Sequence, residues 1–196
     1  YVGVEVGIPN FANLFMTSPE INIDPTIAGS VVGTYWFLMM IGRLCGASIG
    51  AKVSSRAMLT VVSTVGIVLV LGAIFCADNI LVNMPVFKSD ISFGFAQVPV
   101  NVMLLILCGL CTSVMWGGIF NLAVEGLGKY TAAASGLFMV MVCGGGILPL
   151  IQGGVADFAG FLNSYWVIAL GLAYILFYAA IGSKNVNTDI PTDDYE

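Results

Sequence analysis

The stretch from Pro99 to Glu125 decides the fold class, because it reads PVNVMLLILCGLCTSVMWGGIFNLAVE and carries no charge before its last residue. A helix needs about 20 mainly apolar residues to cross the hydrocarbon core of a bilayer. These 27 residues are long enough to do so. We therefore expect a transmembrane helix here, and lipid as the solvent for most of the chain.

The composition of the whole chain supports this interpretation. Of 196 residues, 59% are hydrophobic and 9% are charged, against about 45–50% and about 25% in soluble domains. The mean hydropathy is +1.00. A net charge of −5 without a basic patch excludes nucleic-acid binding. The absence of histidine excludes a His general base and a His-ligated metal site, and no cofactor is expected.

Further apolar runs on both sides of that stretch predict an all-α membrane protein with six spans. The expected spans are residues 1–16, 26–50, 57–77, 99–125, 130–153 and 163–182. Residues 78–98 are interpreted as a loop. Residues 1–183 then form one six-helix domain, and residues 184–196 form a polar, acidic tail.

The first span is short. Sixteen residues of helix rise about 24 Å, less than the roughly 30 Å of the hydrocarbon core. We therefore expect the chain to start within a helix and to be the C-terminal piece of a longer membrane protein.

The basic residues predict the orientation. The side that holds the loops after spans two and four and the tail carries Lys52, Arg56, Lys129 and Lys184, whereas the other side carries Lys88. Lys and Arg gather in cytoplasmic loops. A cytoplasmic C-terminus is therefore expected.

Glu5 is the first candidate for a binding residue, because a carboxylate inside an apolar span is costly without water or a partner. Helical spacing puts Glu5, Pro9 and Asn13 within about 80° of one another, and Asn10 within about 140° of Glu5. Carboxylate and amide groups on one face suit a hydroxyl-rich ligand in a cavity. A buried polar contact between helices is the alternative.

The fourth span contributes a second group of candidates. Thr112 and Trp116 are four residues apart and share a helix face. Trp116 lies at mid-membrane depth, where its ring can stack on a sugar or pack against another helix. Asn121 lies further along the same span and faces elsewhere.

Arg43 lies inside the second span, so it either reaches the interface or meets an acid. Glu125 ends the fourth span on the same side of the membrane. An Arg43–Glu125 pair is one possibility, and separate solvation of the two charges is the other.

Glycine clusters mark two further helices. Gly42, Gly46 and Gly50 form a stripe that favours close helix packing. Breaks built from Gly and Pro are found in the moving helices of transporters. The fifth span therefore holds either a bend or a hinge, at the cluster Gly144, Gly145, Gly146 and Pro149.

Several motifs together resemble the fucose–proton symporter family of the major facilitator superfamily, and within it the bacterial glucose/galactose-type transporters. The motifs lie in residues 1–7, 42–46, 118–128, 139–149 and 154–160. The resemblance implies that the six spans are helices 7 to 12 of a twelve-helix transporter in the bacterial inner membrane. It implies that helices 7 and 10 line a sugar site near the midplane, between two six-helix halves.

The resemblance also implies where this chain differs from its family. Trp116 stands where the fucose branch has a tyrosine, and Glu5 stands where that branch has a small residue. The carboxylates that the family uses for proton coupling lie in the N-terminal half, which is absent from this sequence.

The function that follows is secondary active transport of a hexose together with H⁺, by alternating access. No catalytic pair is found, so the chain is not expected to be an enzyme. The expected partners are the sugar, the proton, the missing N-terminal half and membrane lipid. A sugar sensor or scaffold with the same fold but no flux is the alternative.

Overall fold

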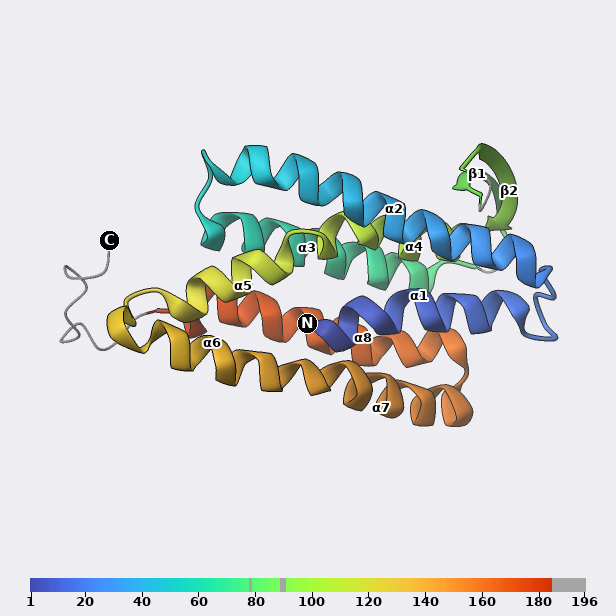
Figure 1. The fold of residues 1–196 in the computed structure, drawn as a ribbon. Coiled ribbons are helices and arrows are strands. Elements are labelled where there is room, and N and C mark those ends of the chain that lie inside the picture. Colours follow the sequence, from blue (N-terminus) through green and yellow to red (C-terminus); the bar gives the residue numbers. More distant parts are fainter. Residues whose placement is uncertain (78, 89–90, 185–196) are drawn as a thin grey trace.

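A computed structural model describes residues 1–77, 79–88 and 91–184, and Figure 1 shows a bundle of helices that run along one long axis. The elements are α1 (Val2–Thr17), α2 (Pro25–Gly50), α3 (Ser55–Phe75), β1 (Leu81–Phe87), β2 (Phe93–Pro99), α4 (Val100–Thr112), α5 (Met115–Val124), α6 (Thr131–Val140), α7 (Gly144–Ala159) and α8 (Phe161–Phe177). Short 3₁₀ turns precede α6 and α7, and a π-helical turn, Tyr178–Gly182, follows α8.

Five helical segments are long and apolar enough to cross a membrane. They are Pro25–Gly50, Ser55–Phe75, Val100–Val124, Gly128–Ala159 and Phe161–Gly182. Helix α1 makes the sixth rod of the bundle and has 16 residues, as short as the sequence predicted. Each expected span is helical in the structure, and five of the six are long and apolar enough to cross a membrane. The fifth is longer than expected and continues to Ala159.

Local sequence explains where the helices begin and turn. The Asp24 carboxylate caps α2 by accepting a hydrogen bond from the Thr26 amide at 2.8 Å, and this bond lowers the pKa of Asp24. Positive φ angles at Gly126, Gly128 and Gly160 (75°, 46° and 90°) make the turns before α6 and α8. Residues with a Cβ rarely adopt such angles.

The two ends of the bundle differ in charge. The loops after α2 and α5 lie at one end, together with the end of α8, and the loops after α1 and α3 lie at the other (Figure 1). Four of the six Lys/Arg residues lie at or next to the first end, namely Lys52, Arg56, Lys129 and Lys184. The asymmetry on which the predicted orientation rests therefore holds in the folded chain.

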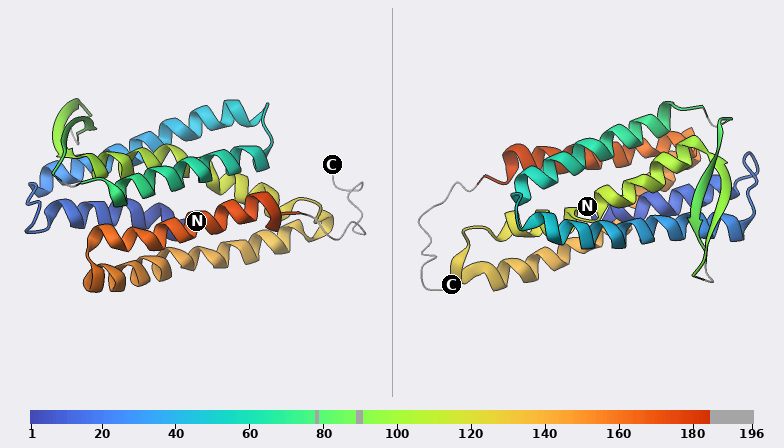
Figure 2. Two further views of the ribbon diagram at one scale, coloured as in Figure 1. Left: turned by 180° about the vertical axis from the view of Figure 1, so that it is seen from behind. Right: turned by 90° about the horizontal axis from the view of Figure 1, so that it is seen from above.

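The loop expected at residues 78–98 is instead largely a β-hairpin, and this prediction was wrong. Strands β1 and β2 pair antiparallel from Leu81↔Pro99 to Phe87↔Phe93, and Figure 2 shows the hairpin at one end of the bundle. The Phe87 amide donates to the Thr34 hydroxyl of α2 at 2.9 Å, and the Phe87 ring stacks on Phe37 with centroids 4.6 Å apart. The hairpin is thereby fixed to α2.

The two predicted glycine clusters differ in packing. A Cβ at Gly42 or Gly46 would collide with Ser113 or Val114, between α4 and α5. A Cβ at Gly50 would meet only the Met58 methyl group, at 4.0 Å. The packing interpretation therefore fits Gly42 and Gly46, and Gly50 does not take part in that contact.

In the second cluster, the helix is interrupted just before the glycines, by the 3₁₀ turn Met141–Cys143. A Cβ at Gly145 would press on Val2 of α1, whereas one at Gly144 or Gly146 would meet no atom within 4 Å. Pro149 lies inside α7.

Candidate functional site

A cavity of about 570 Å³ opens between the first turn of α1, the second half of α2, the start of α3, and α5. Its wall includes Tyr1, Glu5, Arg43, Trp116 and Asn121. Glu5 and Arg43 are the charged residues among those that line it. The cavity therefore brings together a carboxylate, a guanidinium group, an amide and aromatic rings.

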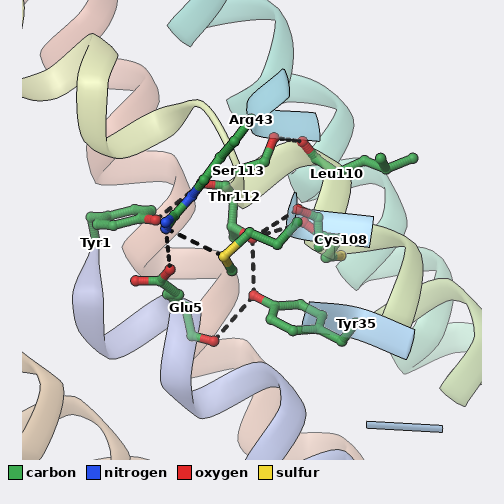
Figure 3. Close-up of polar contacts among 10 residues, drawn as sticks. Tyr1, Glu5, Tyr35, Arg43, Cys108, Leu110, Thr112 and Ser113 are labelled. Carbon is green, nitrogen blue, oxygen red and sulfur yellow. Dashed lines mark hydrogen bonds and ion pairs between the residues drawn. The ribbon is translucent and has the colours of Figure 1, made fainter. Parts of the chain in front are cut away.

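Pro9 and Tyr35 fix the backbone at Glu5. Pro9 has no N–H, so the carbonyl of Glu5 four residues earlier lacks the donor that an α-helix normally supplies. The hydroxyl of Tyr35 on α2 donates to that carbonyl at 3.1 Å, as Figure 3 shows. The same hydroxyl lies 3.0 Å from the Thr112 hydroxyl of α4. Three helices are thus joined by hydrogen bonds next to Glu5.

Arg43 forms an ion pair with Glu5, with 3.3 Å between Nη2 and Oε1 (Figure 3). The same nitrogen lies 3.4 Å from the sulfur of Met39. The suggested pair between Arg43 and Glu125 is therefore wrong. Glu125 lines another cavity, beside Arg56. Spacing within one helix shows which residues share a face, but it does not show which faces of two helices meet.

Trp116 belongs to an aromatic cluster at the side of the cavity. Its ring centroid lies 6.0 Å from that of Tyr1 and 5.1 Å from that of Phe138. Tyr1 is held in turn by its hydroxyl, which donates to the Thr112 carbonyl at 3.0 Å.

The helical segment that carries Trp116 is interrupted at Ser113 and Val114, between α4 and α5. The expected continuous fourth span is therefore two helices.

The six candidate binding residues separate into two groups. Glu5, Trp116 and Asn121 line the cavity, so the expectation that Asn121 faces elsewhere than Trp116 was wrong. The Asn121 amide donates to the Ser55 hydroxyl at 3.4 Å. Asn10 is exposed elsewhere, and Asn13 is half-buried outside the cavity. Asn13 lies about 12 Å along α1 from Glu5, because each residue of helix rises about 1.5 Å. The expectation that Asn13 shares a cavity with Glu5 and Trp116 is therefore not met.

Thr112 has a different place from the one expected. Its side chain is buried, and its hydroxyl bonds within the bundle to Tyr35 and to the Cys108 carbonyl. Thr112 therefore stabilises the cavity wall from inside the bundle.

Sequence reasoning missed the contributions of Tyr1 and Tyr35. The spacing of Tyr1, four residues before Glu5, was the available signal.

The described residues contain no group of three or more Cys, Asp or Glu that could hold a metal ion. Cys108 and Cys111 of α4 are buried free thiols. The chemistry available in the cavity is therefore hydrogen bonding, ion pairing and ring stacking.

No family model matches the chain. The glucose/galactose transporter of Brucella abortus is 30% identical over 186 residues, which make up 94% of this chain and 40% of that protein. The L-fucose–proton symporter of Escherichia coli is 33% identical over 92 residues, 46% of this chain and 21% of that protein.

The fold has a counterpart among solved structures. The crystal structure of FucP, a major facilitator superfamily transporter in the outward conformation, matches with a TM-score of 0.77 and 21% identity, over 95% of this chain and 40% of that one. This chain spans about two fifths of the length of these two transporters.

The relatives are named as transporters, which confirms the expectation that the chain is not an enzyme. The names and the apolar helices together indicate a multi-pass membrane protein. The resemblance found in the sequence is confirmed: the chain is a homologue of bacterial glucose/galactose transporters and of the fucose–proton symporter, and it has the fold of the major facilitator superfamily.

Proposed function

We propose that this chain is the C-terminal six-helix half, helices 7 to 12, of a hexose–proton symporter in a bacterial inner membrane. The observation that carries the proposal is the cavity in which the ion pair of Glu5 and Arg43 lies near Trp116. The names of the homologues point to the same class of substrate.

The residues of the cavity match the chemistry of a monosaccharide. The Glu5 carboxylate accepts hydrogen bonds from sugar hydroxyls, and the Arg43 guanidinium donates hydrogen bonds to them. The Asn121 amide can do both. The exposed side of the Trp116 ring offers an apolar surface on which the C–H face of a sugar can pack.

Transport by alternating access requires a second half on the other side of the sugar. Two observations support such a partner: the chain spans about two fifths of its relatives, and the cavity is open rather than enclosed. In this scheme the cluster Gly144, Gly145, Gly146 and Pro149, with the 3₁₀ turn before it, provides a bending point in α6–α7. The basic end of the bundle is cytoplasmic.

Counterflow in proteoliposomes tests the proposal. The full-length protein that contains this chain is reconstituted with unlabelled D-glucose or D-galactose inside, and entry of the labelled sugar is measured. We expect exchange of at least one of the two sugars, and slower exchange in W116A at sugar concentrations that do not saturate the wild type. Binding of sugar without exchange would instead indicate a sensor. The absence of both binding and exchange would overturn the sugar site.

A further inference from the structure

Glu5 and Arg43 differ in their surroundings although they form one ion pair. The Glu5 side chain is 13% exposed, whereas that of Arg43 is 57% exposed and reaches into the cavity. A carboxylate sheltered in this way depends on its partner, because charges are costly inside a membrane protein. Adding a proton to Glu5 removes the charge that holds Arg43.

The surroundings single out Glu5 as the acid at this place. The titratable and charged groups near it are Tyr1 on its own helix and Arg43 and Tyr35 on α2. Cys108 on α4 and Tyr165 on α8 lie near Tyr35. Phenols and thiols ordinarily ionise well above neutral pH, and Arg stays charged. Helix α7 also packs on α1, and its one acid, Asp157, is exposed.

The position of the Glu5 backbone does not depend on the ion pair. The Tyr35 hydroxyl holds the Glu5 carbonyl, and α1 packs against α2, α4, α7 and α8. The ion pair joins two side chains through one 3.3 Å contact. It can therefore open without moving a helix, and the freed guanidinium has donors to offer to a sugar.

We propose that Glu5 is a proton-binding residue of the transport cycle, and that its protonation opens the Glu5–Arg43 pair and frees Arg43 to bind sugar. This inference rests on the proposed function, and it places a coupling residue in this half of the transporter. The proton comes from water in the open cavity and adds to a carboxylate oxygen. It leaves to water on the other side of the membrane after the sugar, when the ion pair forms again.

Three variants test the inference in proteoliposomes that contain the full-length protein, with labelled D-glucose and D-galactose as probes. E5Q has nearly the size of Glu5 but cannot bind or release a proton. E5D keeps a titratable carboxylate. D157N is the matched control, because it removes an exposed acid on α7, away from the cavity. Counterflow and uptake driven by an inside-alkaline gradient are both measured.

We expect wild type, D157N and E5D to show counterflow and a several-fold stimulation of uptake by the gradient. We expect E5Q to exchange sugar with a changed affinity, because Glu5 lines the cavity, and to lose the stimulation by the gradient completely. Full stimulation in E5Q would overturn the inference. Loss of counterflow in folded E5Q would also overturn it, because Glu5 would then be a sugar ligand alone.

The control outcomes separate this inference from the proposed function. Counterflow by the wild type without gradient stimulation would overturn the coupling role and leave sugar transport intact. If the wild type showed neither counterflow nor uptake driven by the gradient, the proposed function itself would be overturned. If E5Q does not fold, a pH indicator in weakly buffered detergent measures whether the wild type and E5D take up a proton when they bind sugar. The absence of proton uptake would overturn the inference.

Discussion

Two segments of the chain are equally suited to cross a membrane but differ in burial, namely Val100–Val124 and Gly128–Ala159. In the most apolar window of the first segment 56% of the residues are buried, whereas in that of the second segment none is buried. Helices α4 and α5 of the first segment pack against α2 and α3. In the second segment, Gln152 is the buried residue of α6 and α7. Lipid and the protein interior are both apolar. Hydropathy therefore predicts that a segment lies in the membrane, but it does not predict whether lipid or other helices surround that segment.

Small and polar residues distinguish the two segments instead. The first holds the contacts of Gly42 and Gly46 with Ser113 and Val114, and the hydrogen bonds of Thr112. In the second segment, a Cβ at Gly136, Gly144, Gly146 or Gly154 would meet no atom within 4 Å, whereas one at Gly145 would press on Val2. Larger side chains at Gly42 and Gly46 should therefore cost more than larger side chains at these four glycines of the second segment.

The largest effect is expected for Gly46→Leu. Its side chain would collide with Val114, and overpacking of this kind costs about 1–3 kcal/mol. The matched variant Gly136→Leu on α6 enters open space and should leave stability unchanged. Membrane yield and thermal unfolding of the two variants check this, and equal stability would erase the contrast between the segments.

An effect of similar size, on sugar binding rather than on stability, is expected for Trp116→Ala. Loss of a ring that packs on the sugar should weaken affinity by about 1–3 kcal/mol. Phe158→Ala on α7 removes an aromatic ring that is 93% exposed and should leave affinity unchanged. Binding of sugar by calorimetry measures both, and an equal loss in the two variants would show that the effect is not local.

A smaller effect is expected for Tyr35→Phe, which removes the hydroxyl between Glu5 and Thr112. Polar contacts between membrane helices contribute about 0.6 kcal/mol on average and up to about 1.7. Tyr130→Phe, on an exposed ring at the start of the second segment, should not change stability. The two unfolding temperatures are to be compared, and a shift in Tyr130→Phe as large as that in Tyr35→Phe would contradict the prediction.

The smallest effect is expected for Asn13→Ala. Because Asn13 lies outside the cavity, its loss should change sugar affinity by less than about 0.5 kcal/mol. Asn121→Ala, which removes an amide from the cavity wall, should weaken binding more. The reverse order of the two affinities would place the sugar on a different face of α1.

The sequence predicts the positions of the helices well, and the contacts between them less well. Apolar length alone locates the spans, and the glycines of residues 125–129 predict the turn before α6. The hairpin was missed, although apolar and polar residues partly alternate in its strands, because Pro85 and the polar flanks of residues 78–98 resemble a loop.

The candidate site shows the same limit. Glu5 stands out in the sequence because a carboxylate is rare inside a span. Its partner Arg43 is 38 residues away on α2, and the choice between Glu5 and Glu125 depends on how α1 and α5 lie against α2. Asn13 was misplaced because face alone was considered, while depth along the helix decides which residues share a cavity.

The absence of an N–H group at Pro9 has a consequence for how this sequence can vary. Alanine at position 9 would let the helix supply its own donor to the Glu5 carbonyl, and the Tyr35 hydroxyl would then no longer be needed there. Loss of that hydroxyl should be tolerated more easily once Pro9 has been replaced. Proline at position 9 and tyrosine at position 35 should therefore be inherited together, as two sites that co-vary although their side chains belong to different helices.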